Sequence, residues 1–148
     1  MFKRGIYMGT DLGEKINLEK LLDNFPFEIW IKNTEGKYIY VNKFTIKNLG
    51  LPKKEIIVKT DFEIRKTEIA NNCYLSDKEV LINNKCIYNE EVILNGDYYE
   101  SFAVYKFPIS LDNGEYLLGG CAKEISYKKS FQKDFNNLFM KSSFEEVI

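Results

Sequence analysis

The chain has 148 residues, of which 45% are hydrophobic and 15% are aromatic, and its formal net charge is −1 at pH 7. A chain of this length and composition can bury a sizeable core, so we expect one folded domain and not a disordered segment. The near-neutral charge favours neither direct nucleic-acid binding nor an anionic membrane surface. No apolar run approaches the length of a membrane span, so none is expected.

The residue types that the chain lacks exclude several kinds of chemistry. It contains no histidine, which excludes His-based acid–base catalysis, His metal ligands and His-ligated haem. Its three cysteines, Cys73, Cys86 and Cys121, are far apart and form no Cys-x-x-Cys pair. We therefore expect no haem, no metal and no disulfide framework, with the cytoplasm as the location. No other catalytic set of residues occurs, so the prediction is that the protein is not an enzyme.

The first third of the chain is predicted to form an arm, a helix and a hairpin. Residues 1–17 are expected to be a loose arm and the start of a flanking helix, which Asn24 and Pro26 end. Strands follow over residues 28–32 and 37–42, because both runs are rich in aliphatic and aromatic residues and the turn sequence Asn-Thr-Glu-Gly joins them.

The middle of the chain is predicted to be helical. A short helix over residues 44–49 ends at Gly50, and Pro52 can open another. Residues 61–85 predict a longer helix, which the capping-box sequence Ser-Asp-Lys-Glu at 76–79 can interrupt.

The remaining sequence predicts three strands and a final helix. Two hairpin turn sequences, Asn-Gly-Asp and Asp-Asn-Gly, separate the strands. The tail is amphipathic, since its apolar residues recur at steps of three and four. The strands are predicted over residues 86–94, 98–109 and 115–125, and the apolar seam of the tail helix comprises Phe131, Phe135 and Leu138.

This order of elements predicts an α+β fold, in which a five-stranded antiparallel sheet is covered on one face by short helices and flanked by N- and C-terminal helices. The pair Gly119-Gly120 lacks the context of a phosphate loop and is expected to mark close packing. One face of the sheet should line an enclosed interior, and the other needs a terminal helix or a partner chain to cover it. Strand alternation places Tyr98, Phe102 and Val104 on one face, and Tyr99, Ala103, Tyr105 and Phe107 on the other.

Several spaced motifs resemble those of PAS domains, the sensory modules of bacterial signalling proteins. The second strand ends in Val41-Asn42, the following helix ends in Leu49-Gly50, and the last strand ends in Glu124-Ile125-Ser126, each similar to the family pattern. The resemblance covers residues 18–126 and leaves residues 127–148 as a linker helix that leads to an absent output domain.

The resemblance implies an interior that binds a small ligand through aromatic walls and a few polar groups. The alternative is a packed core without a ligand, and the residues leave both readings open. The candidate ligand-binding residues are Trp30, Tyr40, Asn42, Phe44, Phe62, Tyr74, Phe102, Val104 and Lys106.

The sequence departs from patterns of the family at two places. Val58 stands where the family has glycine, and a left-handed φ is costly for valine, so we expect the turn there to be shifted. Cys73 lies in a run similar to that of the reactive cysteine of LOV photoreceptors, but about twelve residues too late, and Asp61 occupies the corresponding slot. We therefore expect no covalent flavin photochemistry.

The C-terminal residues 144–148 are similar to the run that opens the ATPase domain of sigma-54-dependent activators. The resemblance thus implies a sensor that relays a ligand or partner signal to the output domain of a sigma-54-type transcriptional regulator. The alternatives are the sensor of a histidine kinase in a two-component system, or of another signalling enzyme, and a dimerisation module without a ligand. We expect a homodimer, because an isolated helix as short as the tail is marginal in water and its apolar seam needs a partner.

Overall fold

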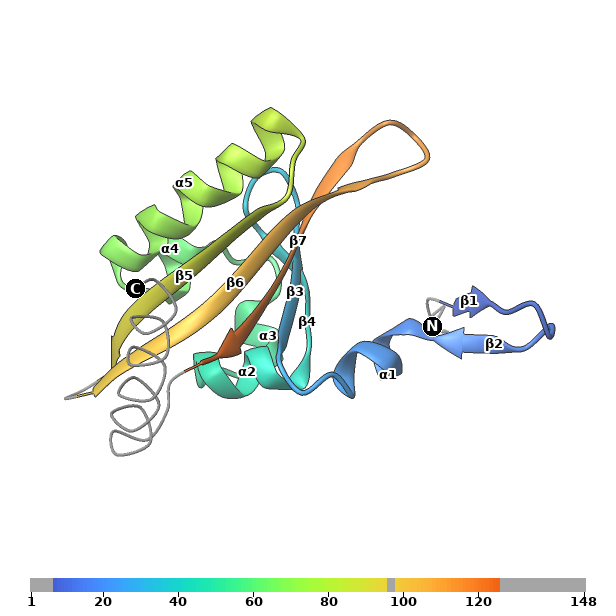
Figure 1. The fold of residues 1–148 in the computed structure, drawn as a ribbon, viewed down its shortest axis with the longest axis horizontal. Helices are drawn as coiled ribbons and strands as arrows, with labels where there is room; N and C mark the ends of the chain where they lie inside the picture. Colours follow the sequence, from blue (N-terminus) through green and yellow to red (C-terminus); the bar gives the residue numbers. More distant parts are fainter. Residues whose placement is uncertain (1–6, 96–97, 126–148) are drawn as a thin grey trace, which may run out of the picture.

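A single antiparallel sheet with helices over one face makes up the body of the protein (Figure 1). The computed structural model describes residues 7–95 and 98–125, and of residues 92–95, 98 and 99 it describes the backbone alone. The strand order is β4-β3-β7-β6-β5, so the predicted α+β fold with a five-stranded antiparallel sheet is confirmed. The strands are β3 (Glu28–Lys32), β4 (Tyr38–Val41), β5 (Ile87–Asn95), β6 (Tyr98–Ser110) and β7 (Tyr116–Glu124).

The helices between β4 and β5 lie on one side of the sheet (Figure 1). The predicted helix over residues 61–85 is two helices, and the break comes at Arg65-Lys66 and not at the capping-box sequence. That sequence lies inside a continuous helix because the Ser76 hydroxyl donates to the carbonyl groups of Asn72 and Cys73 one turn earlier. The helices are α2 (Lys43–Leu49), α3 (Lys53–Ile56), α4 (Asp61–Ile64) and α5 (Thr67–Asn83).

The N-terminal region differs from the predicted loose arm and long helix. Residues Tyr7–Gly9 (β1) and Lys15–Asn17 (β2) pair as an antiparallel hairpin. Helix α1 (Leu18–Asp23) therefore begins only after Asn17, whose side chain caps it by accepting a hydrogen bond from the Lys20 amide at 3.2 Å. The arm is paired and not loose, because residues 15–17 form hydrogen bonds with the chain ahead of the turn.

The two faces of β6 alternate as the sequence predicts. Phe102, Val104 and Lys106 are buried beneath the helices, whereas Tyr105 is exposed and Phe107 half-buried on the opposite face. The predicted Asp-Asn-Gly turn joins β6 to β7, with Gly114 at φ +84°. The side chains of Tyr98 and Tyr99, the turn at 96–97 and the predicted tail helix with Phe131, Phe135 and Leu138 lie outside the described residues.

Two adjacent glycines in β7 allow large aromatic rings to lie flat on both faces of the sheet. A Cβ at Gly120 would collide with the indole of Trp30, and a Cβ at Gly119 would collide with the ring of Phe107. Each ring belongs to the residue opposite its glycine on a neighbouring strand. The interpretation of this pair as a point of close packing is therefore correct.

Val58 adopts the left-handed conformation that the sequence argues against. Its φ is +64°, so the turn is not shifted, and the valine occupies a conformation that costs a β-branched residue energy. Hydrogen bonds hold it there, because the Val58 amide donates to the Tyr38 carbonyl at 2.8 Å and the Tyr38 amide donates to the Lys59 carbonyl at 3.0 Å. These bonds satisfy the outer edge of β4 at Tyr38, which outweighs the local strain.

We predict that Gly120→Ala lowers the free energy of unfolding by about 1–3 kcal/mol, because the added methyl group must displace the Trp30 ring. Urea unfolding followed by the fluorescence of this single tryptophan measures the change. Gly9→Ala is the control, since nothing lies within 4 Å of its Cβ position and its φ is not positive. Equal effects of the two substitutions would contradict the packing described.

We predict that Val58→Gly raises the free energy of unfolding by about 0.5–1 kcal/mol. Relief of a left-handed valine is worth about 1–2 kcal/mol, and the greater freedom of glycine in the unfolded chain offsets part of it. Thermal unfolding is a suitable measurement. Val58→Ala keeps a Cβ atom and should raise the free energy of unfolding by less than Val58→Gly does. A larger increase from alanine than from glycine would contradict the strain at Val58.

Candidate functional site

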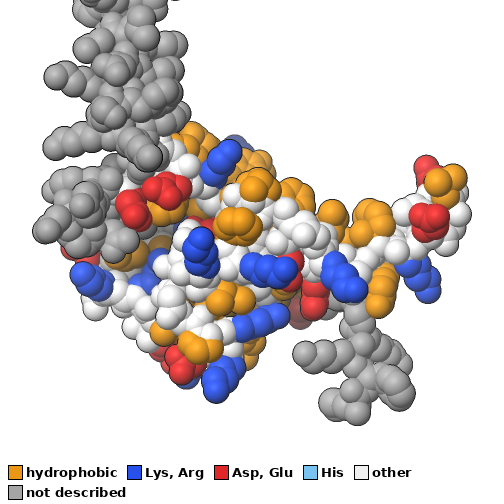
Figure 2. Space-filling model, turned by 90° about the horizontal axis from the view of Figure 1, so that it is seen from below, with side chains coloured by type: hydrophobic (Ala, Val, Ile, Leu, Met, Phe, Trp, Pro, Cys, Tyr) orange, Lys and Arg blue, Asp and Glu red, His pale blue; other side chains and the backbone are white. Residues whose placement is uncertain are grey.

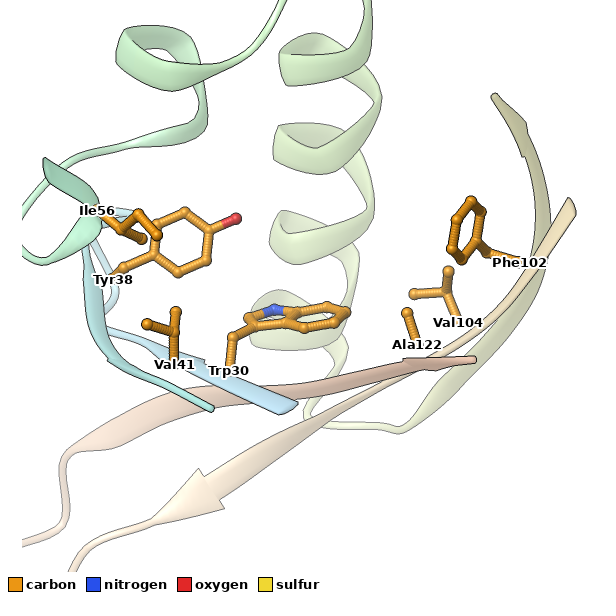
Figure 3. Packing of buried hydrophobic residues seen from close by; sticks show 7 residues of the cluster. All are labelled: Trp30, Tyr38, Val41, Ile56, Phe102, Val104 and Ala122. Carbon is orange, nitrogen blue, oxygen red and sulfur yellow. The ribbon is translucent and has the colours of Figure 1, made fainter. Parts of the chain in front are cut away.

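The candidate site lies between the sheet and the helices, around a cluster of buried hydrophobic residues. Three predicted ligand-binding residues, Trp30, Phe102 and Val104, belong to it. In Figure 3 the Trp30 indole extends from β3 toward Val104 and lies between the Tyr38 side and the Phe102 side of the cluster. The cluster comprises Trp30, Tyr38, Val41, Ile56, Phe102, Val104 and Ala122.

Three of the predicted interior aromatic residues are exposed. About half of the surface of Phe62 and of Tyr74, 49% and 50%, is exposed to solvent. Their rings contact each other on the outside of α4 and α5, with the ring centroids 6.1 Å apart. Phe44 is also exposed, because Thr45 is the residue of α2 that is buried. The expectation that these rings enclose the interior was wrong, because the inward positions of α4 and α5 include two aspartates, Asp61 and Asp77.

Two further predicted ligand-binding residues, Tyr40 and Asn42, lie in positions that suit a structural role. Tyr40 pairs with Ile31 and so lies on the outer face of the sheet, where burial, with the charges of Asp23 and Glu19, raises its pKa to about 12. The Asn42 amide nitrogen donates to the carbonyl groups of residues 22 and 27, and its oxygen accepts from the amides of residues 29 and 45. Asn42 thus caps α2 and ties it to β3.

A buried network of charged side chains joins the sheet to the helices. The Asp77 carboxylate accepts from Lys106 Nζ at 2.7 Å through Oδ1 and from Lys32 Nζ at 2.8 Å through Oδ2. Lys32 also donates to Asp61 Oδ2. All four residues are buried. The two lysines come from β3 and β6, and the two aspartates come from α4 and α5, so the network fixes both helices on the sheet.

Further hydrogen bonds complete the two ends of the network. At one end, Asp61 Oδ1 accepts from the Tyr38 hydroxyl at 2.7 Å and from Arg65 Nε at 2.9 Å. At the other end, Lys106 Nζ donates to the Ser76 hydroxyl at 2.6 Å. Buried charges are tolerated when they are paired and hydrogen-bonded in this way.

The formal charges around the network balance. Burial raises the pKa of Glu28, although a hydrogen bond with Asn48 and the charge of Arg65 both act to lower it. Glu28 therefore interacts electrostatically with Arg65 and is a sixth charged residue, in addition to the five that the network already contains. The three cationic residues are Lys32, Arg65 and Lys106, and the three acidic residues are Glu28, Asp61 and Asp77.

The charged forms dominate the central pair. Burial alone would raise the pKa of Asp61, but the charge and hydrogen bond of Lys32 outweigh it and hold the pKa below its usual value. Burial alone would lower the pKa of Lys32, but the surrounding Tyr38, Asp77 and Asp61 raise it. Both residues are therefore ionised throughout the physiological range.

Trp30 carries a polar atom that the network does not use. The side chain is 9% exposed, and its Nε1 is buried without a hydrogen-bond partner among the described residues. Trp30 and Lys106 both lie opposite Gly120, one on each neighbouring strand, so their Cα atoms are about 10 Å apart on the inner face. The indole covers Gly120, and Nε1 is among the indole atoms nearest to the position that a Cβ at Gly120 would occupy.

Sequence reasoning found one member of the network, Lys106, and missed the others. Strand alternation in β3 places Lys32 on the same face as Trp30, so this lysine could have been found. Asp61 and Asp77 give no such signal, because an acidic residue near a helix start or on a polar helix normally faces solvent. Their separation along the chain hides that both pair with one lysine.

The described residues give little sign of other sites. They contain no group of three residues that could hold a metal ion. Cys73 is half-buried on α5, and burial raises the pKa of its thiol. The absence of flavin photochemistry stays a prediction. In the described part of the chain, none of the helices has the length and apolar character that a membrane span requires.

No protein-family model matches this sequence, and no curated protein matches it. Solved structures do share its architecture. The PAS domain of Bordetella pertussis BvgS has a TM-score of 0.67 at 14% identity, over 84% of this chain and 95% of that chain. The fold is that of a PAS domain. The predicted fold is thereby confirmed.

Two further solved structures share this architecture. A sensory box sensor histidine kinase from Vibrio cholerae has a TM-score of 0.60 at 15% identity, over 74% of this chain and 90% of that chain. VqmA of Vibrio cholerae, solved in a complex with a ligand and DNA, has a TM-score of 0.66 at 18% identity over 74% of this chain. The present chain spans about half, 52%, of that VqmA chain. These neighbours share the fold with the present chain.

We predict that Asp61→Asn lowers the free energy of unfolding by about 3–5 kcal/mol at pH 7, because it leaves Lys32 and Arg65 of the PAS interior without one carboxylate. The folded pKa of Asp61 is depressed, so its contribution is complete above the unfolded value of about 3.9 and is lost as the pH falls toward the folded value. The difference between wild type and variant should therefore be constant from pH 7 to 5 and shrink below pH 4.

Urea unfolding at pH 7, 5 and 3 measures this dependence. Glu79→Gln is the matched control, since Glu79 is an exposed acidic residue of α5 and its loss should change stability by less than about 0.5 kcal/mol. A difference between wild type and Asp61→Asn that stays the same down to pH 3 would show that the ion pair does not act as described.

Proposed function

We propose that this chain is the sensory module of a signalling protein, and that it binds a small uncharged molecule between the inner face of the sheet and helices α4 and α5. The module carries no catalysis of its own and passes a conformational change to an attached output domain. The observation that carries the proposal is the buried Trp30 Nε1, a donor without a partner in the described part of the chain, beside a network of charges that is already balanced.

The chemistry of the interior selects the class of ligand. A ligand that carries a net charge would add an unpaired ion to a set of three cationic and three acidic residues, which is costly in a buried site. An uncharged molecule with an oxygen or nitrogen acceptor would instead satisfy Trp30 Nε1. Its apolar part would contact Phe102 and Val104, which lie on the same face. Small ligands are typically held by such apolar walls with a few oriented polar groups.

The network offers a route by which the ligand would act on the fold. A molecule beside Trp30 and Lys106 presses on residues of β3 and β6, and Lys32 and Lys106 connect those strands to α4 and α5 through Asp61 and Asp77. Strand β7 lies between β3 and β6, and the chain continues from its end toward residues 127–148. A change in sheet geometry would therefore reach the segment that leads to the output domain.

For the output domain we favour a sigma-54-type transcriptional regulator. The support is the similarity of residues 144–148 to the start of the ATPase domain of such regulators. A histidine kinase is the second candidate, and its support is the sensor histidine kinase among the structural neighbours. In both cases the module would work in the cytoplasm as a homodimer, and its partners would be the ligand and the output domain.

Native mass spectrometry of the purified 148-residue chain tests the ligand. We predict a non-covalent adduct of one constant small mass that wild type retains and that Trp30→Phe loses about 2- to 10-fold more readily. This range corresponds to a net hydrogen bond of about 0.5–1.5 kcal/mol. The phenylalanine keeps an aromatic ring over Gly120 and removes the N–H donor.

Tyr74→Phe is the control, because it also removes one polar hydrogen from an aromatic residue but on the exposed side of α5. It should retain the adduct as wild type does. An adduct that both variants keep equally, or wild-type protein that carries none after gentle purification, would argue against a ligand held by Trp30. A ligand with a net charge would refute the proposed class.

A further inference from the structure

The N-terminal hairpin carries apolar side chains that its own chain leaves uncovered. We name residues 7–17 the arm. Tyr7, Met8 and Leu12 are exposed there, Leu12 to 86%. The arm projects beyond α1, away from the sheet (Figure 1), and hydrophobic side chains lie along its surface (Figure 2). A two-stranded hairpin is marginally stable by itself in water, so the arm gains stability from a surface to lie against.

The direction of the arm is set by contacts at the end of α1. The Leu22 carbonyl accepts from the Asn42 side chain at 3.1 Å, and the Asp23 carboxylate accepts from the Lys43 amide at 3.2 Å. These bonds fix the end of α1 beside the start of α2, and only the short helix separates this point from the arm. The arm is thus held clear of the rest of its own sheet.

The sheet presents a second apolar surface on the side that faces away from the helices, and none of the described helices covers it. We name this surface the outer face. Tyr88, Tyr105 and Cys121 lie across it on β5, β6 and β7, because Tyr105 is opposite both of the others. Tyr88 and Tyr105 are exposed. The outer face continues to β3, where Ile29 lies opposite Cys121 and is only half-buried.

We propose that the arm of one chain lies on the outer face of a second copy, and that the two copies exchange arms reciprocally. Both surfaces are apolar and belong to every chain, yet the anchored α1 keeps them apart within one chain. A twofold exchange satisfies both at once, since each copy gives an arm and receives one. The reciprocal contact also doubles the buried area, toward the roughly 1,600 Å² of a standard interface.

Native cysteines on the outer face allow a direct test. Cys121 lies on that face, and Cys86 lies beside Tyr105, so a thiol introduced at the tip of an arriving arm would come close to one of them. We would oxidise the full chain carrying Leu12→Cys and identify the cross-linked peptides by mass spectrometry. Mixing ¹⁵N-labelled with unlabelled chains before oxidation distinguishes links between copies from links within one chain.

Leu75→Cys is the matched control, since Leu75 is comparably exposed, at 63%, but lies on α5 across the sheet. The expected result is a link from position 12 to Cys86 or Cys121 with mixed isotope labels, at least tenfold more abundant than any link from position 75. Absence of that link, or a link from position 12 within a single chain, would overturn the exchange.

Sedimentation velocity supplies an independent readout. The double variant Tyr7→Asp/Met8→Asp should shift the chain from dimer toward monomer by at least tenfold in dissociation constant, whereas Ile82→Asp, on the exposed side of α5, should not. A dimer that the arm variant leaves unchanged overturns the proposal. So does a wild-type monomer whose Cys86 and Cys121 resist maleimide, because residues 126–148 of the same chain would then cover the outer face.

Discussion

The pairing of Lys32 with Asp61 and Asp77 is the interaction on which the arrangement of the helices depends. It joins the central part of the sheet to α4 and α5, and Lys106 repeats the connection from β6. Removing these charges from water costs several kcal/mol per ion, which the mutual attraction offsets only if the geometry is maintained. A helix that slid by one turn would leave a buried charge unpaired, so the network penalises alternative placements more than apolar packing would.

The packing around the network follows from the need to fit a large ring and long cationic side chains on one sheet face. Gly120 gives the Trp30 ring room to lie flat over β7. On the other side of Gly120, Lys106 lies opposite the same glycine. Gly119 does the same for Phe107 on the outer face. The sheet is therefore thin along β7, and both of its faces are built on aromatic rings that neighbouring strands supply.

The periodicity of the strands made the sheet predictable, whereas the sequence did not predict which residues of the helices face inward. Alternation in β6 placed Phe102, Val104 and Lys106 together, because a period of two leaves no choice once one residue is buried. On α4 and α5 the usual preference for apolar residues inside fails, since Asp61 and Asp77 face inward and Phe62 and Tyr74 face outward. Only tertiary pairing with Lys32 decides this, and a linear pattern does not contain that information.

The same balance of charge bears on which molecules this interior can accommodate. Each ionic group already has a partner of opposite sign, so a charged molecule gains little from entering unless it displaces a carboxylate and leaves that group buried and unpaired. An uncharged molecule would meet no such penalty and could accept a hydrogen bond from Trp30 Nε1, which has no partner among the residues described. The network then has two roles that share one cause. It holds the helices in a single register, and under the proposed function it disfavours any ligand that carries a net charge.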